Sequence, residues 1–422
     1  MAEIQPLAAL HYDLERTDGL DPVVAPPYDV IDEDQRAALE MRSPYNVVRI
    51  DLPQGSAQTP DRYARAAEIL EGWIQDGVIV RERSPAVWAL EQDYTGPDGQ
   101  ARTRRGFLAR VRVEQYGPGR IRPHERTHPG PREDRLRLTR ATRTNLSPIF
   151  ALHSDPEQAA WKALGPHTAA APWGQTRDAD GTVSRLWSVQ DERAIAAVRD
   201  ALAPSELLIA DGHHRYETAR VYADEIGGEG PHRYVLMCLV ALEDPGLTVF
   251  PTHRLVRGLS DEQVQRLAEA LRRDFEIIGL DSIEELYPEP GERVQIGYID
   301  AHFKKPYLLR LKDQAIADRA MPDRPEPYRR LDTAVFEALI LKGALGMSDE
   351  QIERLEGLGY ARDDEQALEL VQGGAFDAAF MMAPTPVSQV QAIAAAGESM
   401  PPKSTYFFPK VPTGLLFNPL FD

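Results

Sequence analysis

The chain has 422 residues, 42% of them hydrophobic, which predicts roughly two to three domains with sizeable cores. Its formal net charge of −18 argues against a surface for nucleic acid or anionic membranes, because both reward positive charge. Cys238 is the single cysteine, so no disulfide forms within a monomer, and neither a membrane-length apolar stretch nor a signal pattern is seen. We therefore expect a soluble cytoplasmic protein.

The first region, residues 1–115, is predicted to be α+β. The patterns predict helices at 33–42 and 61–75 and strands at 46–53, 86–92 and 104–113. The last two strands flank Gly96-Pro97-Asp98-Gly99, a strong turn signal, so they form a hairpin and the sheet is not purely parallel. Tyr28 follows a Pro-Pro turn and is a candidate pocket residue, although ordinary turn chemistry explains this segment equally well.

The central region, residues 116–258, opens on the polar loop Arg122-Pro123-His124-Glu125-Arg126-Thr127-His128, before a predicted helix at 132–144. Residues 120–143 hold eight arginines against three acids in a chain that is negative overall. At 100° per residue, one face of this helix carries Arg132, Arg135 and Arg143. Arginine binds anions through a planar, bidentate group, so the stripe indicates an anion-facing surface.

The most informative stretch runs from Leu207 to Ala219. A short apolar run predicts a buried strand, a glycine allows a tight turn, and apolar residues at helical spacing continue until Gly227-Gly228. The polar residues of the turn are Asp211, Gly212, His213, His214 and Arg215. They lie where a helix begins, and free main-chain N–H groups and the positive end of the helix dipole bind phosphate there. The simpler alternative is that the aspartate only caps the helix.

The third region, residues 259–422, is predicted to be α+β. Just before it, His253-Arg254 places a second His–Arg pair at a strand exit. The tail is apolar and aromatic, so we expect it to pack back onto the body. Its candidate phosphate contacts are Lys403, Ser404 and Thr405, with an ordinary surface lysine as the alternative.

His124-Glu125-Arg126-Thr127-His128 also matches H-E-x-x-H, the zinc-hydrolase pattern. That chemistry needs a helix that places both histidines on one face. Pro129 directly follows the second histidine and disfavours a helical conformation there. The neighbouring arginines would also repel a divalent cation. Zinc hydrolysis is therefore a minor alternative.

Five spaced motifs resemble one bacterial and archaeal family, catalogued as domain of unknown function ten-fifteen. They are Ala25-Pro26-Pro27-Tyr28-Asp29-Val30, Arg122-Pro123-His124-Glu125-Arg126-Thr127-His128, Ala210-Asp211-Gly212-His213-His214-Arg215-Tyr216-Glu217-Thr218-Ala219, Pro251-Thr252-His253-Arg254-Leu255-Val256 and Pro402-Lys403-Ser404-Thr405-Tyr406-Phe407. The resemblance covers nearly the whole chain, but the family name carries no function.

The strand–D-G-H-H-R–helix turn is also similar to the phosphate-binding turn of the ParB and sulfiredoxin superfamily. That superfamily includes CTP-binding partition proteins, sulfiredoxins that use ATP, and free-serine kinases. The resemblance implies an α/β fold with mixed sheets and phosphate contacts from Gly212, His213, His214 and Arg215. The first family tends to be associated with serine synthesis through phosphoserine, which implies serine or phosphoserine as the ligand.

We therefore expect a phosphoryl-transfer enzyme acting on a small metabolite, either a phosphoserine phosphatase or a nucleotide-dependent free-serine kinase. The candidate catalytic residues are Glu125 and Asp211 as bases and His124, His213 and His214 as proton carriers. The candidate binding residues are Gly212, Arg215, Arg122, Arg126, His128, His253, Arg254, Lys403, Ser404, Thr405 and Tyr28. ATP or ADP is the expected co-substrate, and Mg²⁺ would be held by Asp211 or Glu125.

The alternative is a ParB-like regulatory module that binds nucleotide without turnover. The net charge of −18 and the lack of a clear helix-turn-helix weigh against DNA as its partner. The sequence leaves the oligomeric state open.

Overall fold

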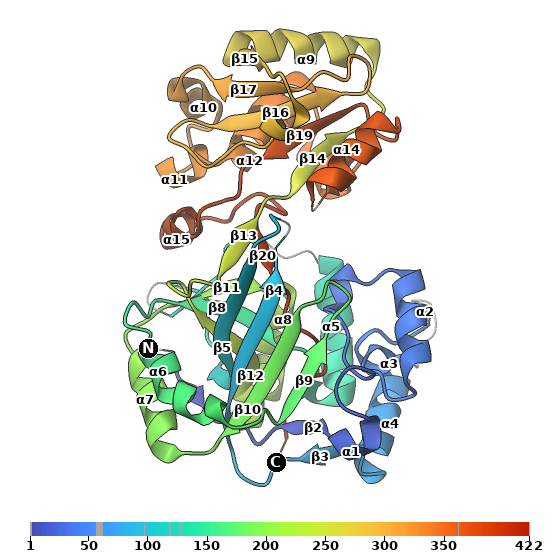
Figure 1. Ribbon diagram of the computed structural model, residues 1–422, viewed down its shortest axis with the longest axis vertical. Coiled ribbons are helices and arrows are strands. Elements are labelled where there is room, and N and C mark those ends of the chain that lie inside the picture. The colour runs from blue at the N-terminus through green and yellow to red at the C-terminus, as the bar shows by residue number, and fades with distance from the viewer. Residues whose placement is uncertain are drawn as a thin grey trace. The chain divides into compact units, whose positions relative to one another are not determined.

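The computed structural model describes residues 2–55, 62–96, 98–117, 120–125, 129–361 and 363–421, except the side chains of 129–131. The chain divides into two compact units (Figure 1). Unit 1 consists of Met1–Thr248 and Pro409–Asp422, and unit 2 consists of Val249–Phe408. These two units differ from the expected regions 1–115, 116–258 and 259–422. Strands from both sides of residue 115 pair in one sheet, and the end of the chain returns to unit 1.

Unit 1 is built on a nine-stranded sheet with the order β6-β11-β8-β12-β5-β4-β10-β9, and β1 also pairs with β5. These strands are β1 (Ile4–Gln5), β4 (Val87–Thr95), β5 (Ala101–Arg112), β6 (Ile121–Arg122), β8 (Ile149–His153), β9 (Gly174–Arg177), β10 (Val183–Val189), β11 (Leu207–Asp211) and β12 (Tyr234–Ala241). The β11–β6 and β12–β8 pairs are parallel, whereas β11–β8, β12–β5 and β4–β5 are antiparallel. The predicted α/β class with mixed sheets is confirmed.

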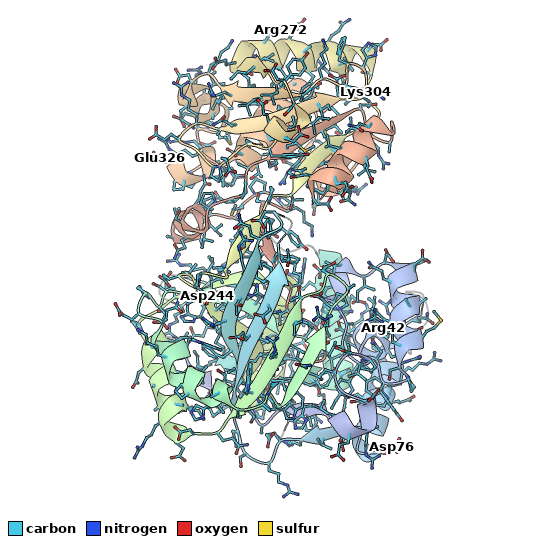
Figure 2. All side chains as sticks on the ribbon, viewed as in Figure 1. Arg42, Asp76, Asp244, Arg272, Lys304 and Glu326 are labelled. Atoms are coloured by element: carbon cyan, nitrogen blue, oxygen red, sulfur yellow. The ribbon has the colours of Figure 1, made fainter. Side chains whose placement is uncertain are left out.

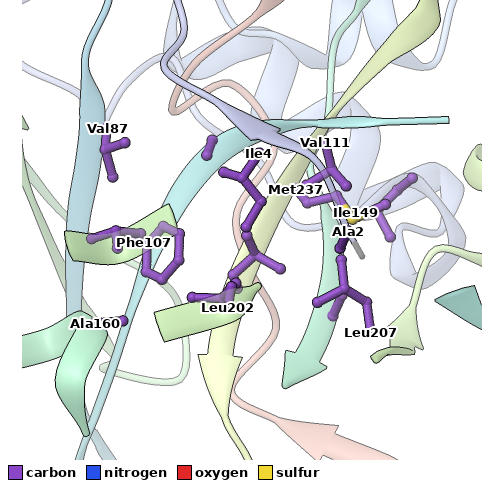
Figure 3. Close-up of a cluster of buried hydrophobic side chains, with 14 of the residues drawn as sticks. Ala2, Ile4, Val87, Phe107, Val111, Ile149, Ala160, Leu202, Leu207 and Met237 are labelled. Atoms are coloured by element: carbon purple, nitrogen blue, oxygen red, sulfur yellow. The ribbon is translucent and has the colours of Figure 1, made fainter. Parts of the chain in front are cut away.

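Three helices cover one face of this sheet: α6 (Ala159–Leu164), α7 (Glu192–Leu202) and α8 (His213–Ile226). Side chains alternate between the two faces of a strand, so Leu207 and Ile209 of β11 join this core while their neighbours point the other way. Figure 3 shows part of the cluster, with Leu202 from α7 close to the strand residues. The β11–α8 corner is therefore anchored in this hydrophobic core by residues of both elements.

The beginning and end of the chain pack together within unit 1. Strand β2 (Leu10–Tyr12) exchanges main-chain hydrogen bonds with Phe417, at 3.0 and 2.8 Å between Leu10 and Phe417. The Tyr12 and Phe417 rings lie 5.6 Å apart. Short strands β7 (Thr144–Asn145) and β21 (Asn418–Pro419) pair as well. The apolar tail thus packs onto the body through its last residues.

The other α-helices of unit 1 that the structure describes lie in its first 142 residues. They are α1 (Leu14–Thr17), α2 (Glu33–Arg42), α3 (Val48–Asp51), α4 (Arg62–Gln75) and α5 (Pro129–Thr142), and strand β3 (Ile79–Arg81) pairs with β2. The helix predicted at 33–42 is confirmed as α2, where Asp32 and Gln35 form a reciprocal capping box.

The strand predicted at 46–53 is wrong, because this segment forms helix α3. Asn46 explains the difference. Its side chain accepts a hydrogen bond from the Val48 N–H at 3.0 Å and donates to the carbonyls of Pro22 and Val24 at 2.8 and 3.1 Å. The helical start is therefore fixed by partners more than twenty residues earlier, which no local pattern shows.

Unit 2 contains a six-stranded sheet with the order β15-β17-β16-β19-β14-β18, in which every pair is antiparallel. The strands are β14 (His253–Val256), β15 (Phe275–Gly279), β16 (Gln295–Asp300), β17 (Tyr307–Leu311), β18 (Leu358–Ala361) and β19 (Ala378–Met382), and β13 (Thr248–Phe250) pairs separately with β20 (Tyr406–Phe408). The helices are α9 (Asp261–Asp274), α10 (Gln314–Ala320), α11 (Glu326–Arg329), α12 (Asp332–Val335), α13 (Asp349–Glu353), α14 (Asp364–Gln372) and α15 (Val387–Ala395), and α12 continues as a π-helix at Phe336–Ala344. Helix α14 buries Ala367 and Val371 against one face of the sheet. In the described part of the chain, no helix is both long and apolar enough to cross a membrane.

Replacing Asn46 by alanine is expected to destabilise unit 1 by about 2 kcal/mol, because the two carbonyls and the N–H lose their partner inside the protein. Urea denaturation measures the change. Glu71→Ala, an exposed position on α4, should change stability by less than about 0.5 kcal/mol. Equal stability of the two variants would contradict the role given to Asn46.

Candidate functional site

The carboxylate of Asp211, at the end of β11, binds two cations. Lys410 Nζ donates to Oδ1 and Arg215 Nη2 donates to Oδ2, both at 2.5 Å. Burial alone would raise the pKa of Asp211, but Lys410 and Arg215 outweigh it and hold the pKa well below the usual range. The aspartate is therefore ionised and carries one negative charge between two positive ones.

Gly212 makes the sharp turn from β11 into α8. Its φ of 93° lies in the left-handed region, which favours glycine. A Cβ at this position would also lie 2.9 Å from Nε of Arg215. Gly212 is the N-cap of α8 and no side chain caps it, so the first turn of the helix follows directly after Asp211. The corner thus has the construction of a phosphate-binding helix start.

The guanidinium of Arg215 donates hydrogen bonds to several protein groups at this corner. Besides Asp211, its Nη1 donates to Ser147 Oγ at 2.6 Å and to the carbonyl of Pro148. These bonds tie α8 to the segment that enters β8. Among the described residues, Nε of Arg215 has no hydrogen-bond partner. Arg215 therefore orients Asp211 and keeps one buried N–H unused.

His124 and His213 form a buried pair beside the turn. Their rings meet edge to face at 4.7 Å, and the His124 main-chain N–H donates to His213 Nε2 at 3.3 Å. His124 Nδ1 donates to the Ile209 carbonyl at 2.6 Å, which places the lone pair of this neutral ring on Nε2. Nε2 lies 3.9 Å from Glu125 Oε1.

Burial is the main cause that lowers the pKa of both rings, and for His213 the neighbouring His124 lowers it further. Both imidazoles are therefore neutral near pH 7. A neutral imidazole accepts a proton, so the pair has the chemistry of a general base. His214, the next residue on α8, is half-buried.

Two other predicted residues of unit 1 are engaged elsewhere. Arg122 makes a bidentate ion pair with Glu206 at 3.0 and 3.1 Å. The Tyr28 ring lies 4.2 Å from the guanidinium carbon of Arg135, and burial raises the pKa of Tyr28 to about 12 despite nearby arginines. Tyr28 is therefore a neutral phenol near pH 7.

The arginine stripe predicted as one anion-facing surface is divided. Arg135 is buried and donates to Asp51 Oδ1 at 3.1 Å and to Asp134 Oδ2 at 2.6 Å. Arg143 stacks on the Phe421 ring at 5.0 Å, and Arg132 is exposed. Arg132 and Arg135 lie on α5, whereas Arg143 follows the end of that helix. Asp134 of the same helix and Asp51 of α3 neutralise the charge of Arg135.

Five predicted binding residues belong to unit 2: His253, Arg254, Lys403, Ser404 and Thr405. His253 begins β14 and pairs with Asp364 at 2.6 Å, while Arg254 holds the carbonyls of Pro402 and Lys403, both at 3.1 Å. Ser404 is buried and donates to the Pro401 carbonyl at 2.7 Å. These contacts fix the 401–405 loop onto unit 2, and Lys403 is exposed.

Lys410 is the site residue that the sequence analysis missed. The tail was expected to return with Lys403 toward the phosphate corner, but the lysine on Asp211 lies seven positions later. One sequence signal could have identified Lys410. It lies between Pro409 and Val411, in a tail that is too apolar to remain in solvent.

Arg126 and His128 lie outside the described residues. Helix α5 begins at Pro129, after the H-E-x-x-H motif, so His124 and Glu125 are not on that helix. Among the described residues, no three His, Cys, Asp or Glu side chains are grouped to hold a metal ion. Asp211 does not fit Mg²⁺ as placed, because an added cation would meet Lys410 and Arg215 on the same carboxylate.

We compared a cavity in unit 1 with a cavity in unit 2 as possible ligand sites. One of about 40 Å³ lies beside the corner in unit 1 and is lined by Arg215, Ser147, Asp51 and Arg135 among others. It has room for water or a small group. A cavity of about 450 Å³ lies in unit 2, between α9 and β15–β17, and none of the predicted site residues lines it.

The chain belongs to the family described as protein of unknown function (DUF1015), which matches residues 4–334. No curated protein matches it in sequence. Among solved structures, it is similar to a conserved hypothetical protein from Pyrococcus furiosus, at 18% identity and a TM-score of 0.37, over 70% of this chain and 90% of that one. It is also similar to a free serine kinase in complex with AMP, at 17% identity and a TM-score of 0.37, over 68% and 83%. C-terminally truncated SbnI from Staphylococcus aureus matches at 12% identity and a TM-score of 0.36, over 71% and 82%.

The histidine pair predicts a loss of stability in mild acid. The folded-state pKa values of His124 and His213 lie below the value of about 6.5 in the unfolded chain. The unfolded chain then binds more protons below that pH, so stability is complete above about pH 7 and falls as the pH drops further. Replacing both residues by asparagine should reduce this loss by up to about 1.4 kcal/mol per pH unit for each histidine.

Urea denaturation at pH 5, 6, 7 and 8 measures the slope. His153→Asn is the positive control, because burial lowers the pKa of His153 to about 4 at a position on β8. A double variant with the wild-type slope would contradict the neutral, buried pair.

Proposed function

We propose that this protein is a phosphoryl-transfer enzyme acting on a small metabolite. One observation carries the proposal. The start of α8 adjoins both a lysine–aspartate–arginine cluster and a neutral histidine pair, and a helix start favours the binding of anions. Phosphoryl transfer needs little more than positive charge on the phosphoryl oxygens and a base for the attacking oxygen.

Each group has a role in this scheme. The N–H groups after Gly212 and the ammonium of Lys410 bind the phosphoryl oxygens. Asp211 and Arg215 hold Lys410 and the turn in place. The neutral pair of His124 and His213 accepts the proton of the attacking hydroxyl or water.

The bonds that form and break can be written out for hydrolysis and for the kinase reaction. In hydrolysis, a water oxygen bonds to phosphorus, the bond from phosphorus to the metabolite oxygen breaks, and the water proton passes to the imidazole before the leaving oxygen is protonated. In the kinase direction, the metabolite hydroxyl attacks the terminal phosphoryl group of ATP or ADP. The same imidazole accepts the hydroxyl proton, and the nucleotide leaves with one phosphate fewer.

Serine and O-phosphoserine are the first ligands to test, because the Asp211–Arg215 turn resembles that of free-serine kinases in sequence. Purified protein is incubated with phosphoserine, or with serine plus ATP or ADP, each with and without Mg²⁺. Serine formed from phosphoserine alone selects a phosphatase, and serine consumed only with nucleotide selects a kinase. Nucleotide binding without turnover of any substrate would favour a regulatory module instead.

The two tail lysines provide a matched pair of variants. Lys410→Met removes the ammonium beside Asp211 and is expected to lower turnover about a hundredfold or more, since charge stabilisation of this kind contributes that much in other enzymes. Lys403→Met, which changes an exposed lysine of unit 2, should leave turnover unchanged. Equal activity of the two variants would contradict the assignment of Lys410.

A further inference from the structure

Arg104 is a buried arginine that the site described so far does not use. It lies on β5, is only 1% exposed, and donates through Nη2 to Gln92 Oε1. Among the described residues, neither Nε nor Nη1 of Arg104 has a hydrogen-bond partner. Three N–H groups of a permanently charged side chain are therefore buried without acceptors in the described part of the chain.

The neighbouring acids do not neutralise Arg104. Asp244, labelled in Figure 2, accepts from the main-chain N–H groups of Gly246 and Arg105 at 2.9 and 3.4 Å. Asp211 is shared by Lys410 and Arg215. Burial lowers the pKa of Arg104, and nearby Cys238, Tyr94, Asp244 and Asp211 only partly oppose it. A buried charge without a paired counter-charge is strongly unfavourable unless something else binds it.

Arg104 is connected to the phosphate corner by two routes. Its guanidinium stacks on the Phe150 ring at 4.5 Å, and Phe150 is the register partner of Asp211. Its partner Gln92 also donates to the main-chain carbonyl of Lys410 at 3.3 Å. Phe150 and Gln92 therefore link Arg104 to the corner where Lys410 and Arg215 bind Asp211.

We propose that Arg104 binds an anionic oxygen of the ligand at this corner and that the ligand carries at least two negative charges. A phosphate monoester or a polyphosphate meets this requirement, because two negative charges balance the excess of the three cations over Asp211. The inference rests on the proposed function for its ligand class, but it concerns binding and needs no turnover.

The full-length protein is titrated with inorganic phosphate and with phosphoserine by calorimetry and by thermal shift, as wild type and as Arg104→Met. Methionine removes the unpaired buried charge, so the free variant should melt at or above the wild-type temperature. Its affinity for both ligands should fall at least tenfold, and the rise in melting temperature at a given ligand concentration should become smaller.

Arg110→Met is the matched control. Arg110 lies on the same face of β5, six residues along, and donates to Gln5 Oε1 at 2.8 Å. This variant should bind phosphate as the wild type does. If Arg104→Met does not fold, Arg104→Lys, which keeps the charge but only one nitrogen, is titrated instead and should show the same loss of affinity.

The outcomes separate the two proposals. Wild-type affinity in the Arg104 variant, with lower stability of the free protein, would show a structural role satisfied by water and would overturn this inference. If binding depends on Arg104 but no phosphorylated substrate is turned over, the phosphoryl-transfer proposal is contradicted and the inference about Arg104 is supported. If the wild type binds neither phosphate nor phosphoserine, both proposals fail.

Discussion

One carboxylate held between two cations connects three parts of unit 1. Asp211 joins the end of β11 to α8 through Arg215 and to the end of the chain through Lys410. Arg215 extends the connection to Ser147 and Pro148 at the entrance to β8. Removing either cation would take away one of the two partners of this largely enclosed carboxylate, which is more costly than losing a surface ion pair. The corner therefore forms only when the C-terminal residues, which carry Lys410, pack onto the rest of unit 1.

The same constraint gives the corner its chemistry. The start of α8 supplies N–H donors, the cluster around Asp211 carries more positive than negative charge, and the two neighbouring imidazoles remain neutral. A phosphorylated ligand would accept hydrogen bonds from these N–H donors and balance the excess positive charge. A neutral imidazole would accept the proton of the attacking oxygen. The predicted residues of unit 2 make contacts within that unit. His253 and Arg254 hold Asp364 and the 401–405 loop in place.

Local signals were enough to predict β11, the glycine turn and α8, because strand length, a left-handed residue and helical periodicity are all contained in one short stretch. They were not enough for partners that lie far away in the chain. Asn46 turns a strand-like segment into a helix through carbonyls of Pro22 and Val24. Lys410 reaches Asp211 across about two hundred residues, a pairing that no spacing rule contains. Arg104, inside a strand, looked like any other charged residue of a hairpin until its burial was known.

The most direct test of the central claim is a crystal structure of the protein with phosphate or phosphoserine bound. The account predicts a phosphoryl group at the main-chain N–H groups of the first turn of α8, within hydrogen-bonding distance of Lys410 Nζ. A phosphoryl group bound elsewhere at saturating concentration, with the start of α8 covered only by apolar side chains, would contradict it.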